Sequence, residues 1–183
     1  MVSLKIFVDT KNKKVVFAEA GKEFIDFILD MLSLPLSIVA KLLKEHNESK
    51  VGCIGALYHS IEALSPSCFE SDSHKGMALK PRTNVVIPLL SCYEGRSGQQ
   101  ASLQPTNYPS YGRKFVKEAI SFIVMDNLEV KPMSATLIKS IVIDFDILTE
   151  QEVQVGCNEG LNLLKASLES QTVLSTVFLW NKK

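Results

Sequence analysis

The stretch 4–43 limits what this chain can fold into, because it joins a strand pattern to two strongly apolar helix patterns. Every second residue of 4–8 is aliphatic, which is typical of a β-strand with a buried face. The polar run 9–14 favours a turn, since Asp and Asn bond their own backbone and tolerate left-handed conformations. The β-branched and aromatic run 15–18 predicts a returning strand. The chain therefore opens with a β-hairpin.

Two helices separated by a proline are predicted directly after this hairpin. Polar side chains recur every three or four residues from 22 to 45, which places them on one narrow face of a helix. Pro35 lacks an amide hydrogen and clashes with a preceding helical turn, but a helix accepts proline in its first turn. We therefore expect helices at 22–32 and 35–45, with broad apolar surfaces that form part of a core.

The middle of the chain predicts one more helix and then loses its apolar pattern. Apolar residues at helical spacing predict a helix at 52–64, and the polar stretch 68–84 is typical of a loop. The run 85–90 predicts a short strand that Pro88 restricts to an edge or a bulge. Residues 93–112 contain hardly any aliphatic side chains, so a flexible linker or long surface loop is expected there.

The second half repeats the order of hairpin and helix. Residues 119–125 predict a strand, Asp126 and Asn127 a turn, and 128–131 a returning strand. Ser134 is a suitable N-cap for a following helix. The next segment, 141–147, fits a strand or a helix, because its apolar positions match both periods.

A capping box formed by Thr149 and Glu152 predicts the last long helix, at 150–168. Gly156 and Gly160 would each lower the stability of that helix by about 1 kcal/mol relative to alanine. Their expected use is close approach to another element.

Together these elements predict an α+β protein made of two β-hairpin-plus-helix units that pack into one body, with antiparallel sheet and helices. The N-terminal unit spans 1–92, the linker 93–112 and the C-terminal unit 113–183. A length of 183 residues suits one domain or two small units that pack closely.

Composition argues against several classes of function, although a local basic patch is compatible with it. Twenty basic and twenty acidic residues cancel, so the overall charge provides no basic field for nucleic acid. An uninterrupted apolar stretch of about 18–20 residues is lacking, so we expect no membrane-spanning helix. Four irregularly spaced cysteines, without a secretory signal, predict reduced thiols. A cytoplasmic location is expected, with a nucleocytoplasmic one as the alternative.

Cys53, Tyr58 and His59, on the helix predicted at 52–64, are the candidate catalytic residues. Cys53 and His59 could approximate a thiol–base pair. Six residues along a helix, however, place them about 120° off register around its axis. A buried thiol is therefore the favoured interpretation of Cys53.

Cys68, Asp72 and His74 lie close together in sequence and are the candidate metal ligands. An ordinary polar loop explains them better, because no further pair of ligands accompanies them. Asp144 and Asp146 would share a strand face and could act as an acid–base pair or bind a divalent cation, although a solvated edge is favoured. Phosphate-loop, dinucleotide, zinc-protease and hydrolase motifs are absent, and no cofactor or resident metal is expected.

Several ordered segments spread over nearly the whole chain carry a resemblance. They are Leu4-Lys-Ile-Phe-Val-Asp, Val16-Phe-Ala-Glu-Ala-Gly-Lys-Glu-Phe-Ile-Asp-Phe, Leu34-Pro-Leu, Gly52-Cys-Ile-Gly-Ala-Leu-Tyr-His-Ser-Ile-Glu, Leu79-Lys-Pro, Phe115-Val-Lys, Val130-Lys-Pro-Met-Ser and Glu159-Gly-Leu-Asn-Leu-Leu-Lys-Ala-Ser-Leu. In these the chain resembles an uncharacterised plant family named as domain of unknown function 674. The resemblance implies a plant protein and brings no assigned activity. It also implies paired Cys-x-x-Cys motifs of zinc-ribbon type, yet Cys92 stands alone here, so the zinc role does not carry over.

These observations favour a non-enzymatic protein-interaction or self-association module, whose partner is another protein or a second copy of the chain. Neither nucleic acid nor a membrane is expected as a partner. The alternative is a small-molecule-binding protein or enzyme with a pocket between helices and sheet, where Cys53, Tyr58 and His59 would be the residues to test. The lack of a convergent polar cluster weighs against an enzyme without excluding one.

Overall fold

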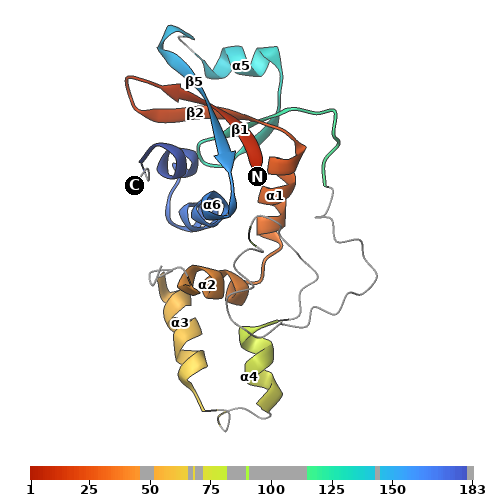
Figure 1. Cartoon of the computed structure of the whole chain (residues 1–183), viewed down its shortest axis with the longest axis vertical. Helices are drawn as coiled ribbons and strands as arrows, with labels where there is room; N and C mark the ends of the chain where they lie inside the picture. Colours follow the sequence, from red (N-terminus) through yellow and green to blue (C-terminus); the bar gives the residue numbers. More distant parts are fainter. Residues whose placement is uncertain are drawn as a thin grey trace. The chain divides into compact units, whose positions relative to one another are not determined.

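The computed structural model describes residues 1–45, 52–65, 68, 72–81, 90, 115–142 and 145–180 (Figure 1). In chain order its elements are β1 (Val2–Asp9), β2 (Lys14–Ala20), α1 (Lys22–Leu32), α2 (Leu36–Glu45), α3 (Gly52–Ala63), α4 (Asp72–Leu79), β3 (Phe122–Met125), β4 (Val130–Pro132), α5 (Ala135–Ile141), the 3₁₀ turn η3 (Phe145–Ile147), β5 (Leu148–Val155), α6 (Cys157–Glu169), α7 (Val173–Ser175) and the π-helical turn η4 (Thr176–Trp180). The chain divides into two compact units, Met1–Asp30 with Ile87–Lys183, and Met31–Val86.

One antiparallel sheet of five strands holds the first unit together, in the order β4-β3-β2-β1-β5. The hairpins β1–β2 and β3–β4 join through β2 and β3, and β5 pairs with the other side of β1. The predicted α+β class and antiparallel sheet are therefore confirmed. The arrangement as units 1–92 and 113–183 stays a prediction, and the predicted linker 93–112 lies outside the described residues.

The two faces of this sheet are covered differently. On β1 the alternating side chains of Leu4, Ile6 and Val8 are buried on one face, as the sequence pattern predicts. The helices α6 and α7 contact β5 and β2, and they supply most of the apolar side chains of the C-terminal segment that are buried. On the opposite face, Phe17 and Ile123 are buried and α5 packs against them. Figure 1 shows α5 and α6 on opposite sides of the strands.

Local signals place the first helices correctly. α1 spans the predicted range, whereas α2 begins one residue later than predicted, at Leu36. The carbonyl of Pro35 accepts the amide hydrogens of Ile38 and Val39 at 2.9 and 3.1 Å, so the proline precedes the helix that it starts. Among the described residues, no helix has the length and apolar character needed to cross a membrane.

The second hairpin and its helix also follow the prediction. β3 and β4 flank a turn at Asp126 and Asn127, and the hydroxyl of Ser134 accepts the amide hydrogen of Leu137 at 3.2 Å as the N-cap of α5. In the ambiguous segment 141–147, α5 ends at Ile141 and the 3₁₀ turn η3 begins at Phe145, and none of the described residues of this segment lies in a strand.

The helix predicted at 150–168 is wrong in its first part, where β5 lies instead. β5 pairs with β1 along its whole length of eight residues. The capping-box signal of Thr149 and Glu152 is local, whereas Val153 and Val155 also fit a strand in which alternate side chains are buried. The pairing with β1 supplies more backbone hydrogen bonds than one helical turn, and it decides the conformation.

The long C-terminal helix therefore begins later, at Cys157. Gly156 is its N-cap instead of an interior residue, and its amide donates a hydrogen bond to the Glu159 carboxylate at 2.9 Å. Gly160 does lie inside α6, where it is buried.

The polar stretch 68–84 is not a continuous loop, because residues 72–79 form α4. This helix has little apolar periodicity, which is why the sequence pattern missed it. In the same unit the Lys75 ammonium donates to the carbonyls of Glu62 and Leu64, at 2.8 and 2.6 Å, and so links α4 to the end of α3. The predicted strand 85–90 lies outside the described residues apart from Leu90.

Candidate functional site

The three candidate catalytic residues, Cys53, Tyr58 and His59, lie on a helix, α3, as predicted. Their catalytic role stays a prediction. Tyr58 is buried, and the Lys44 ammonium lies 5.9 Å from its ring centroid. His59 is exposed, with Nδ1 3.9 Å from a Glu62 carboxylate oxygen. Lys44 also pairs with Glu62 and lowers the pKa of that carboxyl, mainly through their hydrogen bond. The side chain of Cys53 lies outside the described part of the chain.

The candidate metal ligands Cys68, Asp72 and His74 stay a prediction, because only two of their side chains can be described. Cys68 is an exposed free cysteine and His74 is exposed on α4, whereas the side chain of Asp72 is outside the description. Within the described residues, no group of three or more His, Cys, Asp or Glu side chains is placed to hold a metal ion. Asp146 is exposed, whereas Asp144 lies outside the described residues. The proposed pairing of these two aspartates therefore stays a prediction.

The expectation of reduced thiols is corrected at one position. Cys157, the first residue of α6, is disulfide-bonded. The spacing of the four cysteines matches no disulfide framework, so the sequence does not distinguish Cys157 from the other three.

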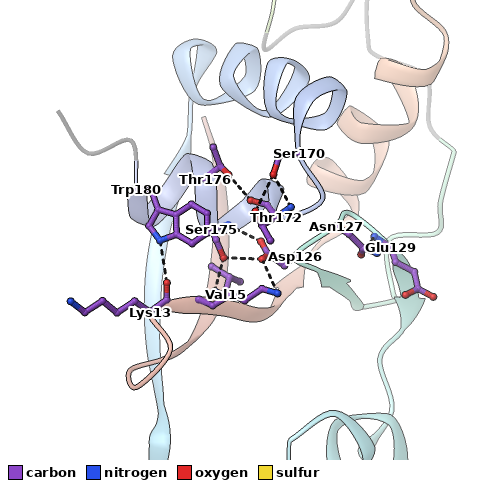
Figure 2. Close-up of polar contacts among 11 residues, drawn as sticks. Lys13, Val15, Asp126, Asn127, Glu129, Ser170, Thr172, Ser175, Thr176 and Trp180 are labelled. Carbon is purple, nitrogen blue, oxygen red and sulfur yellow. Dashed lines mark hydrogen bonds and ion pairs between the residues drawn. The ribbon is translucent and has the colours of Figure 1, made fainter.

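Among the described residues of the first unit, a buried polar cluster centres on Asp126, in the β3–β4 turn (Figure 2). Asp126 is only 6% exposed. One carboxylate oxygen accepts the amide hydrogen of Ser175 at 2.7 Å, and the other accepts the Ser175 hydroxyl at 2.9 Å. The Ser175 hydroxyl in turn accepts the amide hydrogen of Val15 at 2.8 Å. This chain of bonds joins β3–β4, α7 and β2.

Asp126 also binds the start of α7 through its backbone. Its carbonyl accepts the amide hydrogens of Val173 and Leu174 at 2.8 and 3.2 Å. The first free amides of α7 are thus satisfied by a residue from another element, and the negative carboxylate lies where the helix end favours it. Asp126 is therefore a structural clamp, because each oxygen of its carboxylate accepts a hydrogen bond from Ser175 and so holds α7 on the β3–β4 turn.

An open hollow of about 560 Å³ adjoins this clamp, at the ends of the two hairpins. Polar residues dominate its lining: Asp9, Asn12, Lys14, Asp126, Asn127, Glu129, Gln171 and Thr172, with Val15, Val16 and Met125. Asp9 is held by its own turn, and the Lys14 ammonium lies 3.8 Å from the Asp126 carboxylate. The side chains of Asp9, Lys14 and Asp126 are therefore already engaged in contacts within the fold.

Strand β5 forms the second feature of interest, because it is an edge of the sheet. One side of β5 pairs with β1, and within the described part of the chain no strand pairs with the other side. Thr149, Glu150, Glu152 and Gln154 are exposed along it. An edge strand offers a row of amide and carbonyl groups that can pair with another chain.

Negative charge gathers on one face of this edge. Register places Glu19 and Glu152 opposite Lys5 on either side, and Glu150 lies 3.1 Å from the Lys5 ammonium. The pKa of Lys5 is raised, first by its hydrogen bond to Glu150 and then by the surrounding carboxylates. Ser3 donates its hydroxyl hydrogen to Glu152. Three carboxylates around one ammonium leave an excess of negative charge beside β5.

Sequence reasoning missed both features. The turn at Asp126 was recognised, but its partner Ser175 lies in an apolar run far along the chain, where a lone serine is the only signal of a buried polar contact. The alternation of Val153, Gln154 and Val155 was the available signal for β5.

Comparison with known proteins gives a family without an activity. No curated protein and no solved structure matches this chain. A family model described as protein of unknown function (DUF674) matches residues 1–87 and 104–183. The matched ranges cover nearly the whole chain, so the protein belongs to the DUF674 family.

Proposed function

We propose that this protein is a non-enzymatic interaction module that binds an extended segment of a partner protein along the free edge of β5. The observation that carries the proposal is the length of this edge. Eight residues of β5 pair with β1 without a bulge, so the outer edge of the strand is preformed. Addition of a strand to such an edge is a recurring mode of peptide recognition, in which backbone hydrogen bonds supply the affinity.

Charge on β5 argues for a partner of different sequence instead of a second copy. Two copies that pair symmetrically about Gln151 bring Glu150 of each opposite Glu152 of the other. In a register centred on Glu152, the Glu152 side chains of the two chains lie directly opposite each other across the strands. Like charges that are directly opposite across strands are destabilising, and charged side chains on an edge are a common protection against self-pairing.

The same charges define the partner. A strand with lysine or arginine at alternate positions would place its cations opposite Glu150 and Glu152, on the face where carboxylates outnumber the Lys5 ammonium. Each opposite-charge pair across strands contributes about 0.2–1 kcal/mol. Because these pairs are solvent-exposed, salt should weaken the binding.

The test uses a capped peptide that alternates lysine with valine, compared with one that alternates glutamate with valine. We expect the lysine peptide to bind with shifts in the amide NMR signals of β5 and protection of its outward amides from exchange. Replacing both glutamates, Glu150→Lys and Glu152→Lys, should weaken this binding about tenfold and favour the glutamate peptide.

A control variant with Glu129→Lys and Glu169→Lys has the same net charge but leaves β5 unchanged, and it should keep the preference for lysine. Failure of the lysine peptide to bind, or signal changes away from β5, would overturn the proposal. A dimer that forms through β5 would replace the foreign partner with a second copy.

A further inference from the structure

Helix α5 covers its face of the sheet incompletely. None of its residues is buried, and Leu137, Ile138 and Ile141 are only partly buried against the cluster of Phe17, Ile123 and Val142. A hollow of about 310 Å³ remains between α5 and the strands. It is lined by Phe7, Phe17, Met133, Ile138, Leu148 and Glu150.

Two phenylalanines lie in the wall of this hollow, and Phe7 is the more accessible of them. Phe7 of β1 and Phe17 of β2 are cross-strand partners whose rings stack with centroids 4.5 Å apart and planes 19° apart. Phe17 is 2% exposed, so its ring is fixed by the core on which it lies. Met133 adds an adaptable thioether side chain that can follow the outline of an occupant.

One charged group reaches the rim. Of the described residues that line the hollow, Glu150 alone is charged, and its side chain is 56% exposed. One of its carboxylate oxygens lies 3.1 Å from the Lys5 ammonium, which leaves the second oxygen able to accept a further hydrogen bond.

We propose that this hollow is a binding site for a small planar aromatic amine. Its volume lies at the lower end of the range of about 300–1,000 Å³ typical of small-molecule sites, which are mostly apolar with a few polar groups that fix orientation. A planar ring can pack against the partly exposed Phe7, since aromatic rings prefer offset or edge-to-face contact. The ammonium group of such a ligand would meet the Glu150 carboxylate at the rim.

This site does not depend on the proposed pairing of β5. The ligand would contact α5, β1 and β2 as well as β5, and it would bury the side chain of Ile138 that is now partly exposed. Occupation should therefore hold α5 more firmly on the sheet.

Tryptamine and indole-3-propionate provide the test, because they carry the same ring with opposite charge. We expect tryptamine to bind roughly tenfold more tightly than the carboxylate in NMR titrations of the whole chain, with contacts from its ring to Phe7 and the methyl groups of Ile138 and Leu148. Glu150→Gln should remove most of this preference while the ring still binds.

Ile138→Trp fills the hollow and should weaken tryptamine binding more than roughly tenfold without changing peptide binding at β5. Lys139→Trp, on the exposed side of the same helix, is the matched control and should bind as the natural chain does. The proposal is overturned if tryptamine does not bind, if both indoles bind equally, or if folded Ile138→Trp binds unchanged. If that variant does not fold, the Glu150→Gln result decides.

Discussion

The turns of the two hairpins each contain an aspartate, and the two carboxylates have different roles. Asp9, at the surface, accepts the amide hydrogens of Lys11 and Asn12 at 2.9 Å each and the side-chain amide of Asn12 at 2.7 Å. These carboxylate bonds stay inside its own turn. Asp126 is buried, and its carboxylate bonds Ser175, which is 49 positions away in sequence.

The Asp9 bonds therefore belong to local folding of a turn, whereas the Asp126 bonds belong to assembly of the core. The Asp9 bonds can form as soon as the turn closes, because every donor lies within three residues. The Asp126 bonds form only when α7 docks on the sheet, and a buried carboxylate without those donors would be strongly unfavourable. The two aspartates should therefore respond very differently to the same substitution.

Asp126→Ala should have the largest effect, a loss of about 2–3 kcal/mol in the free energy of unfolding, because hydrogen bonds to a buried charged group are lost and the Ser175 donors become unsatisfied. Urea unfolding followed by the fluorescence of Trp180, the single tryptophan, measures it.

Asp126→Asn is the matched control, since it keeps one acceptor oxygen and should lose less stability. Asp9→Ala provides the second comparison and should unfold close to the natural chain. Equal losses for Asp9→Ala and Asp126→Ala would contradict the distinction between a local turn and a long-range clamp.

Ser175→Ala tests the other side of the clamp and should cost about 1–2 kcal/mol, because the amide of Val15 loses its acceptor in a buried position. Combined with Asp126→Ala it should cost less than the sum of the two, as residues in one hydrogen-bond network are not independent. Ser167→Ala, whose hydroxyl bonds only the Leu164 carbonyl one turn earlier in α6, is the control. Strict additivity of the pair would show that the two side chains act separately.

The hairpin turns also differ in how much strain a glycine could relieve. Lys13 has φ 51° and Leu128 has φ 66°, a left-handed region that disfavours residues with a Cβ. Lys13→Gly should stabilise the chain by up to about 1 kcal/mol. Leu128→Gly should gain less, because it also removes a partly buried side chain. Alanine at each position is the control that keeps the strain, and thermal unfolding ranks the variants. A larger gain at Leu128 would reverse this expectation.

Elements fixed by nearby residues were predictable from the sequence. The bounds of α1 follow from a narrow polar stripe after Gly21, and the first hairpin from alternation on either side of a polar turn. For β5 the local signals conflict, because a capping box favours a helix and the alternation of Val153, Gln154 and Val155 favours a strand, and the pairing with β1 decides between them. That partner cannot be recognised from the sequence of β5 alone.

The same limit applies to the candidate sites. Residues such as Tyr58 and His59 could be placed on a helix because their surroundings have helical spacing. The acidic edge around Lys5 requires three strands in register, and the hollow under α5 requires Phe7, Phe17 and Ile138 to meet from different elements. The spacing of residues within one segment carries no information about contacts between segments. Such sites can be predicted only when the pairing of the strands and the packing of the helices are known.

The smallest expected effect concerns the pH dependence of the Asp9 turn. The pKa of Asp9 lies below its ordinary value of 3.8, first because the backbone amide of Asn12 donates a hydrogen bond to the carboxylate. A carboxyl whose pKa is lowered in the folded state stabilises the fold at pH values above its ordinary pKa, and this stabilisation is lost as the pH falls through the lowered pKa. Asp9→Asn should therefore match the natural chain in strong acid and be slightly less stable near neutral pH. Parallel unfolding curves at several pH values measure the difference. A stability gap that widens in acid would contradict the role of the ionised carboxylate in the Asp9 turn.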